Sequence, residues 1–188
     1  MKKIQGFQDS PLTQRGKQLI EEWGATLSQW KWHRIVASDL GRVQQTVEIL
    51  NRSLNLPVHF EHRLREQSWG EWEGLTIPYI RENFPQELER RVALGWEFSA
   101  PGGESRNYLR KRLFTLLKQL HSNYPGEKIL IVCHQGVIKA TLYHIAGRAF
   151  LPEEDPLVQH NSFHLITCYK GDFTSRKLNI PRDYKSED

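Results

Sequence analysis

The sequence predicts an α/β domain in which helices pack on both faces of a mostly parallel sheet. Short β-prone segments alternate with helical segments along most of the chain, a pattern typical of parallel strands joined by crossover helices. The continuous apolar run at residues 129–133 has the character of a strand buried on both faces. Residues 104–120 carry leucines at helical spacing, which is the strongest amphipathic pattern in the chain.

The N-terminal part of the chain predicts a helix, a strand and a second helix. Apolar residues recur at near-helical spacing within residues 11–30, and Thr13 is positioned to act as the N-cap of that helix. Residues 35–37 form a short β-prone run. Ser38 and Asp39 follow this run and supply capping chemistry for the second helix. This order predicts a strand that leads directly into a helix.

The later elements are shorter or interrupted. A moderate helix is predicted near residues 80–94, and Pro85 is expected to break or kink it because proline lacks the backbone N–H. A turn at residues 123–126 ends the long amphipathic helix. The other predicted elements are a strand at 57–60, a helix at 136–145 and a late strand at 163–169.

Composition limits the class of protein. The chain has 188 residues, of which 38% are hydrophobic, and this predicts one domain over residues 1–181 followed by a polar tail at 182–188. No apolar run approaches the roughly 20 residues of a membrane helix. No secretory signal follows Met1, so the expected compartment is the cytosol. Cys133 and Cys168 each lie in an apolar run, which argues against a disulfide framework.

The formal net charge of +4 points to a small anionic substrate. Proteins that bind nucleic acids gather lysine and arginine on one element. Here the basic residues are scattered among acids, as in residues 87–91. We therefore expect neither a nucleic acid nor a membrane as a partner.

Two predicted turns between a strand and a helix carry side chains suited to anion binding. Arg42 lies in the first turn of its helix, where a bound anion would offset its unfavourable interaction with the helix dipole. The alternative is a surface arginine paired with Asp39 or Glu48. His134 directly follows the run at 129–133 and could donate to a phosphoryl oxygen, whereas the alternative is a buried structural histidine.

A candidate general acid lies among three glutamates that surround two tryptophans. Burial beside Trp69 and Trp72 would raise the pKa of a nearby carboxyl group and let it donate a proton near neutral pH. Spacing alone does not choose among the candidates, which are Glu66, Glu71 and Glu73. The alternative is that Arg65 and Glu66 form a solvated ion pair and that the tryptophans belong to the core.

Metal and nucleotide sites are not expected. His59 with His62, or His160 with His164, could face one way, but no further ligand spacing supports zinc. The sequence has no phosphate-binding glycine loop, no nucleophile elbow and no dinucleotide fingerprint. We therefore expect no metal and no other cofactor.

Several motif blocks together resemble the histidine phosphatase superfamily, also called the phosphoglycerate-mutase-like family. They occur in the family's order and span nearly the whole chain. The blocks are residues 5–16, 38–46, 64–66, 70–74, 101–105 and 134–138.

The resemblance implies a three-layer α/β/α fold and a phosphoric monoester hydrolase that acts through a phosphohistidine intermediate. By motif, Glu66 would be the proton donor, and Arg42 and His134 would hold the phosphoryl oxygens. Gln5 and Gly6 would belong to the substrate-binding loop. The middle region is more similar to the broad-specificity and cobalamin-pathway phosphatases than to the dimeric mutases. A small phosphorylated substrate is implied, and the oligomeric state, including a homodimer, stays open.

The resemblance also predicts a missing element. The family begins with a central strand that runs into Arg-His-Gly, whose histidine is the nucleophile, whereas this sequence begins close to the following loop at Gln5. We therefore expect a sheet that lacks its first central strand and a chain that lacks its nucleophile, as from a start codon placed too late or a truncated gene. Loss of a central strand would leave unpaired backbone groups, each costing roughly 1–3 kcal/mol. The in-frame DNA upstream of Met1 tests this.

Two other functions compete with this hypothesis. Cys133, Gly136 and Lys139 have the spacing of a cysteine phosphatase loop, but a lysine replaces the usual arginine and lacks its planar fork. The second alternative is a catalytically inactive protein that binds phosphoesters or serves as a scaffold. We expect little or no turnover by the chain as given, because the phosphate-holding residues alone do not supply the covalent step.

Overall fold

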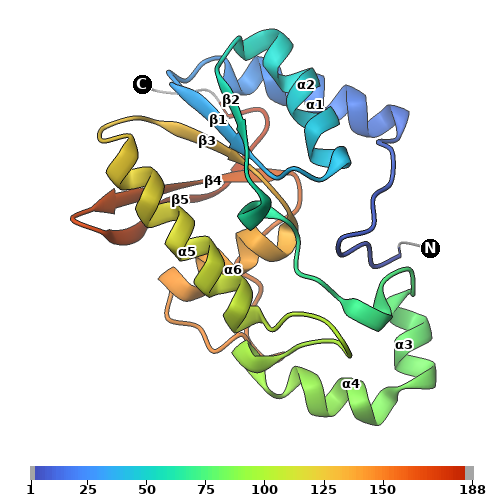
Figure 1. Cartoon of the computed structure of the whole chain (residues 1–188). Coiled ribbons are helices and arrows are strands. Elements are labelled where there is room, and N and C mark those ends of the chain that lie inside the picture. Colours follow the sequence, from blue (N-terminus) through green and yellow to red (C-terminus); the bar gives the residue numbers. More distant parts are fainter. Residues whose placement is uncertain (1–2, 185–188) are drawn as a thin grey trace.

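The computed structural model describes residues 3–184 and shows three layers (Figure 1). Helices α1 (Gln14–Leu27) and α2 (Gly41–Leu54) cover one face of a three-stranded sheet, and α5 (Arg106–Asn123) and α6 (Gln135–Ile145) cover the other. The predicted α/β class is confirmed. None of the helices in the described part of the chain is long and apolar enough to cross a membrane.

The sheet places β1 (Arg34–Ala37) between β2 (Val58–Phe60) and β3 (Ile129–Val132). Both pairings are parallel, and Ile35 lies beside Leu130 in the register of β1 and β3. The carboxyl ends of β1 and β3 therefore meet at one edge, which is where ligands bind in parallel α/β sheets.

Alternate side chains of β1 supply the two halves of the core. Val36 packs with the leucines of α5 and with Val137 of α6. Ile35 and Ala37 pack with apolar residues of α1 and α2 on the opposite face. All three β1 side chains are fully buried. The period of two in a strand thus joins both helical layers through one short element.

Local sequence signals account for the ends of several helices. The Thr13 hydroxyl accepts a hydrogen bond from the Gly16 N–H at 3.0 Å, which confirms it as the N-cap of α1. Pro85 divides the predicted helix near 80–94 into α3 (Ile77–Asn83) and α4 (Pro85–Val92). These two short helices lie away from the sheet (Figure 1).

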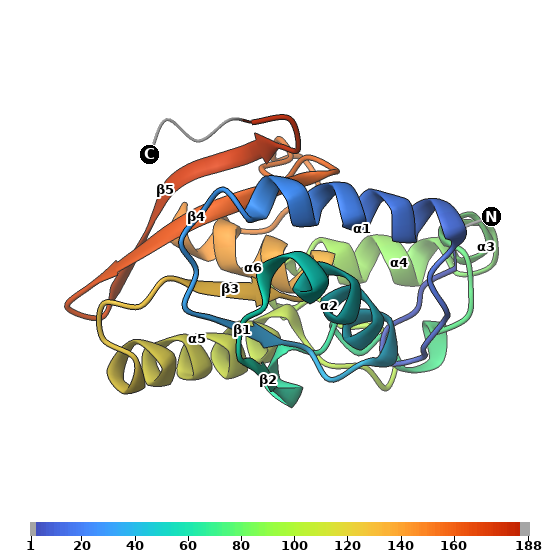
Figure 2. The same ribbon diagram turned by 90° about the horizontal axis from the view of Figure 1, so that it is seen from above.

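The second strand of the C-terminal hairpin was not predicted. β4 (Ser162–Tyr169) and β5 (Asp172–Pro181) form a separate antiparallel pair, which appears as a long projecting arm beside α1 (Figure 2). The first residues of the predicted tail contact the domain: Arg182 forms an ion pair with Glu22, and Tyr184 stacks on Trp30. Residues 185–188 of that tail lie outside the described residues.

Candidate functional site

The side chains that follow β1 and β3 meet at the carboxyl edge of the sheet. Ser38 follows β1, and His134 lies just beyond β3 as the N-cap of α6. The His134 Nε2 atom lies 2.8 Å from the Ser38 hydroxyl, and its Nδ1 atom lies 3.2 Å from Nη2 of Arg42. Parallel pairing of β1 with β3 thus brings Arg42 and His134 together, although their sequence positions are far apart.

The hydrogen bonds of His134 define its tautomer. A guanidinium group only donates, so Nδ1 must accept from Arg42 and Nε2–H must donate to Ser38. Burial and the neighbouring charge of Arg42 lower the pKa of His134 to about 3. His134 is therefore neutral at pH 7, and the positive charge of this pair is carried by Arg42. The alternatives of a buried, hydrogen-bonded histidine and a phosphoryl donor are both compatible with this geometry.

The loop before α1 lies directly against Arg42. Nη2 of Arg42 donates to the Gly6 carbonyl oxygen at 2.9 Å, and Nη1 donates to the Gln8 carbonyl oxygen at 2.8 Å. Gly6 has φ +50°, and an added Cβ would collide with the carboxylate of Glu73. Gln5 instead turns its side-chain amide to the Ser10 hydroxyl. Of the two residues predicted to bind substrate, Gly6 reaches Arg42 and Gln5 does not.

Asp9 caps the helix that carries Arg42. Its carboxylate accepts the backbone N–H groups of Gly41 and Arg42, and one oxygen lies 3.4 Å from Nη1 of Arg42. Burial alone would raise the pKa of Asp9, but the hydrogen bonds from these two N–H groups and the charge of Arg42 outweigh it and lower the pKa. The predicted capping by Ser38 and Asp39 is wrong, because neither side chain accepts the first N–H groups of α2.

The alternative partners predicted for Arg42 and Glu66 are also wrong. Asp39 forms a two-point ion pair with Arg65, at 2.7 and 2.5 Å, and is not paired with Arg42. Arg65 is consequently not paired with Glu66. Glu48 pairs with Arg52 one turn along α2. Arg42 is therefore free of its predicted surface partners and faces the loop before α1.

Glu66 lies beside the start of α6. Oε1 of Glu66 accepts the Gln67 N–H at 2.8 Å, and Oε2 accepts the Gly136 N–H at 3.2 Å. Burial raises the pKa of Glu66, and these hydrogen bonds offset only part of that effect. A carboxyl group with a raised pKa can hold a proton nearer neutral pH, as a general acid requires. An added Cβ at Gly136 would collide with this carboxylate, so glycine permits the approach.

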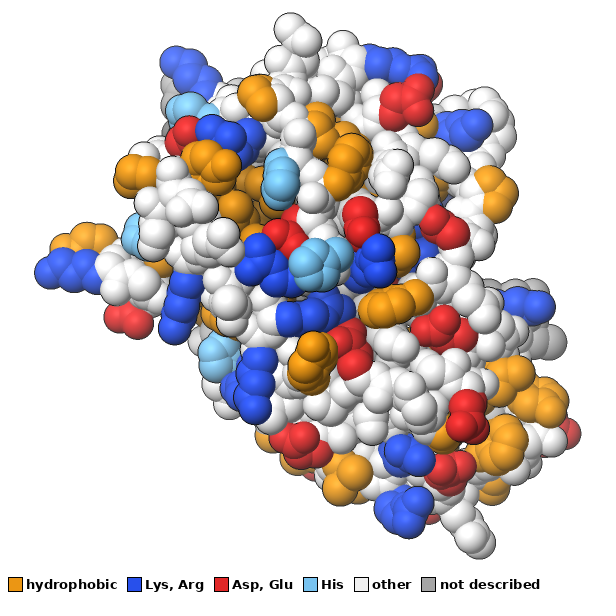
Figure 3. Space-filling model, in the orientation of Figure 1, with side chains coloured by type: hydrophobic (Ala, Val, Ile, Leu, Met, Phe, Trp, Pro, Cys, Tyr) orange, Lys and Arg blue, Asp and Glu red, His pale blue; other side chains and the backbone are white. Residues whose placement is uncertain are grey.

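The other two candidate glutamates, Glu71 and Glu73, lie in different environments. Glu71 is exposed. Glu73 accepts the backbone N–H groups of Phe7 and Trp69, at 3.1 and 3.0 Å, and so ties the loop before α1 to the segment around Trp69. Only Glu66 of the three is joined by a hydrogen bond to the segment that carries His134. Acidic, basic and histidine side chains lie close together near the middle of the face in Figure 3.

Arg112 holds the segment that carries Glu66 in place through hydrogen bonds. This role was not predicted from the sequence. Its guanidinium donates to the carbonyl oxygens of Arg63, Arg65 and Glu66, and it forms a 2.6 Å ion pair with Glu104. The sequence of α5 nevertheless contained an indication that Arg112 has buried partners. Arg112 interrupts the apolar stripe formed by the buried leucines of that helix, and a charged residue on a buried stripe needs partners.

The described residues contain no group of three or more histidine, cysteine, aspartate or glutamate side chains suited to hold a metal ion. Cys133, the last residue of the predicted strand at 129–133, lies just beyond β3, which ends at Val132. Burial, reinforced by the charge of Glu66, raises the pKa of the Cys133 thiol to about 12. The thiol is therefore protonated at neutral pH.

The comparisons with known proteins agree on one family for this chain. Residues 1–181 match the model of the histidine phosphatase superfamily (branch 1). PhoE of Bacillus subtilis, an uncharacterized phosphatase, is 31% identical over 182 residues, covering 97% of this chain and 85% of PhoE. GpmB of Salmonella choleraesuis, a probable phosphoglycerate mutase, is 32% identical over 134 residues, covering 71% of this chain and 62% of GpmB.

Solved structures with the same fold include known phosphatases. YhfR of Bacillus stearothermophilus matches with a TM-score of 0.85 and 27% identity, covering 95% of this chain and 89% of YhfR. The mycobacterial glucosyl-3-phosphoglycerate phosphatase Rv2419c, in complex with VO3, matches with a TM-score of 0.82 and 26% identity, covering 95% and 90% of the two chains. By its family model, its relatives and its fold, this chain belongs to the histidine phosphatase superfamily (branch 1).

Proposed function

We propose that the site formed by Arg42, Glu66 and His134 binds the phosphoryl group of small phosphoric monoesters. The observation that supports this most is their convergence where β1 and β3 end, with a cation, a neutral N–H donor and a carboxyl group of raised pKa. Related proteins are phosphatases by name, including PhoE and Rv2419c. A phosphoric monoester is the substrate class that fits both the site and these relatives.

Each residue has a distinct role in this proposal. The guanidinium of Arg42 neutralises phosphoryl oxygens by charge-assisted hydrogen bonds. His134 would donate its Nε2–H to a phosphoryl oxygen in exchange for the Ser38 hydroxyl, and it adds no charge, because its pKa is lowered to about 3. Glu66 holds the proton that the leaving alkoxide oxygen needs when the phosphorus–oxygen bond breaks. Glu66 thus acts on the leaving group, while Arg42 and His134 act on the phosphoryl group.

We further propose that the chain as given binds such esters with little turnover. The phosphohistidine step needs a histidine nitrogen with a lone pair directed at phosphorus. Both ring nitrogens of His134 are engaged, and its lone pair faces the Arg42 guanidinium. Cys133 does not substitute as a nucleophile, since its thiol stays protonated with a pKa of about 12. These observations favour the binding function over cysteine-dependent hydrolysis.

Calorimetric titration with inorganic phosphate, together with an assay of p-nitrophenyl phosphate hydrolysis, tests this function. We expect measurable phosphate binding that weakens by about tenfold or more in Arg42→Ala, because each lost charge-assisted hydrogen bond contributes roughly 1.5–3 kcal/mol. Arg15→Ala removes an exposed arginine of α1 and is the matched control. Equal phosphate affinity of the wild type and Arg42→Ala would contradict the site. Hydrolysis that depends on both His134 and Glu66 would contradict the absence of turnover.

Asp9 should compete with a bound phosphate. Its carboxylate holds the N–H groups at the start of α2 and faces Arg42, which are the groups that attract an oxyanion. We expect Asp9→Asn to tighten phosphate binding by about three- to tenfold, because the variant removes an internal negative charge. Calorimetry measures the change, with Asp172→Asn on the exposed β4–β5 turn as the control. Unchanged or weaker binding by Asp9→Asn would show that the carboxylate does not compete.

A further inference from the structure

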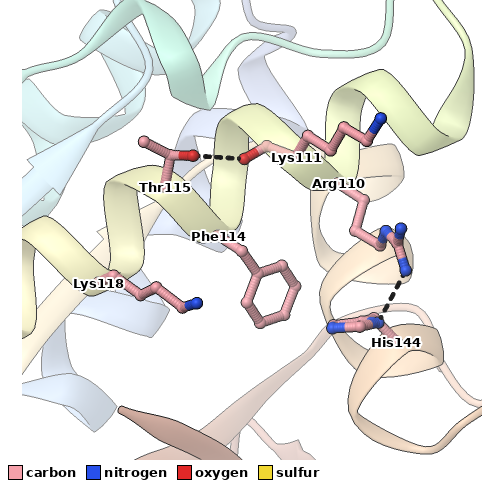
Figure 4. Close-up of a pocket in the computed structure, with 6 residues that line it drawn as sticks. All are labelled: Arg110, Lys111, Phe114, Thr115, Lys118 and His144. Carbon is pink, nitrogen blue, oxygen red and sulfur yellow. Dashed lines mark hydrogen bonds between the residues drawn. The ribbon is translucent and has the colours of Figure 1, made fainter.

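A second basic hollow lies between α5 and α6, on side chains that the proposed phosphoryl site does not use. Its volume is about 300 Å³, at the small end of the range for ligand pockets. Figure 4 shows its walls, with Arg110, Phe114 and Lys118 projecting from α5 and His144 from α6. Lys111 and Thr115 complete the lining.

The cations of this hollow have no acidic partner in the described part of the chain. Most arginines near the sheet are paired, and on the same helix Arg112 forms an ion pair with Glu104 at 2.6 Å. None of the ion pairs between residues 3 and 184 includes Arg110, Lys111 or Lys118. Arg110 and Lys118 face the hollow in Figure 4, whereas the Lys111 amine points away from it, so two positive charges face this hollow without an acidic partner.

Aromatic contacts hold the walls in place. The Phe114 ring lies 4.5 Å from the His144 ring, measured between centroids, and also packs on Phe173 of β5 at 5.6 Å. Nη1 of Arg110 lies 3.3 Å from Nδ1 of His144, and the guanidinium carbon lies 5.2 Å above the Trp96 ring. Ring packing reduces the entropy lost when these side chains engage a ligand.

The positive charges of Arg110 and Lys118 act on the His144 ring. A histidine in the last turn of a helix normally has a raised pKa, because the helix dipole favours its charged form. The pKa of His144 is lowered instead, first by partial burial and then by the charges of Arg110 and Lys118. A bound anion would offset both charges at once.

We propose that this hollow binds a compact oxyanion with two or more negative charges, of the phosphate and pyrophosphate class. The Lys118 amine and the Arg110 guanidinium supply only donors, as such an anion requires. The hollow is separate from the phosphoryl site, because His134 lies at the N-cap of α6 whereas His144 lies in the last turn of the same helix. The inference does not depend on the proposed function of the first site.

Titration with pyrophosphate, followed by the NMR resonances of the histidine rings, tests the proposal. The Arg42→Ala variant serves as the background, because it disables the first site and leaves the hollow intact. We expect saturable movement of the His144 resonance and an upward shift of the His144 pKa on binding. The variant Lys118→Gln should weaken pyrophosphate binding by about tenfold, since it removes one of the two uncompensated charges that face the hollow.

The matched control is Lys17→Gln, which removes the same charge from an exposed position on α1. We expect this control to bind pyrophosphate within about twofold of the Arg42→Ala background, because distant exposed charges are screened by salt. An equal loss of affinity in Lys118→Gln and Lys17→Gln would reduce the effect to overall charge and overturn the proposal. A His144 resonance that stays fixed at saturating pyrophosphate would overturn it as well.

Discussion

Glu66→Gln should abolish the loss of stability that the wild type undergoes as the pH rises. Burial raises the pKa of Glu66 in the folded state above its unfolded value near 4.5, so the folded protein retains this proton to higher pH than the unfolded chain. The stabilising contribution is complete below pH 4.5 and is lost as pH rises through the folded-state pKa. Glutamine does not titrate and loses nothing over that window.

Between pH 4 and pH 8 the unfolding free energy of Glu66→Gln should rise relative to that of the wild type by about 1–2 kcal/mol. At pH 4 the variant should be less stable by about 1 kcal/mol, because glutamine keeps only one oxygen for the two N–H groups of Gln67 and Gly136. Urea unfolding at several pH values measures both quantities.

Glu71→Gln provides the control, since Glu71 is exposed in the same segment. Its stability curve should run parallel to that of the wild type from pH 4 to pH 8. The same Glu66→Gln variant should bind inorganic phosphate about tenfold more tightly at pH 8, because a negative charge beside the oxyanion is removed. A difference in stability between Glu66→Gln and the wild type that does not vary with pH would show that Glu66 has no raised pKa.

Arg112→Ala should cause the largest loss of stability among the variants considered. The Arg112 side chain is only 12% exposed, and removing its guanidinium leaves the Glu104 carboxylate and several carbonyl oxygens without their donor. Breaking a buried ion pair from one side costs about 3–5 kcal/mol. For a domain stable by roughly 5–15 kcal/mol, this is a large fraction of the total. Urea unfolding measures the loss directly.

Two further variants separate this effect from a general loss of charge on α5. Lys111→Ala changes an exposed neighbour and should alter the unfolding free energy by no more than about 0.5 kcal/mol. Arg112→Lys keeps the charge but lacks the planar fork that serves several acceptors at once, so it should recover less than half of the loss. Full recovery by lysine would show that the charge alone matters. A small effect of Arg112→Ala would show that the carbonyl contacts are not important.

Local sequence patterns predicted the elements that are stabilised by their own apolar faces. α5 presents five buried leucines on one stripe, and β3 is a continuous apolar run, so both were found. β5 was missed because most of its side chains are exposed and its segment contains Thr174, Ser175, Arg176 and Lys177. Its pairing with β4 depends on backbone hydrogen bonds, which leave no apolar signature in the sequence.

The sequence predicted correctly that Arg42 and His134 lie at strand-to-helix turns. Arg42 and His134 were singled out because each lies just beyond a predicted strand. The roles of Asp9 and Arg112 were missed because their partners are distant: Asp9 caps a helix that begins 32 residues later, and Arg112 binds carbonyl oxygens 46 to 49 residues earlier. Such contacts exist only once the tertiary fold has formed.

The position of β1 in the sheet also constrains the order of events on the ribosome. Arg34 pairs with Ile129 and Ala37 with Val132, whereas the partner on the other edge, β2, follows β1 closely in the chain. During synthesis the pairing of β1 with β2 and the packing of α1 on α2 can form early. Pairing with β3 must wait until residue 132 has left the exit tunnel. Until then one edge of β1 stays open to solvent and to chaperones, and the residues that flank the proposed phosphoryl site remain apart.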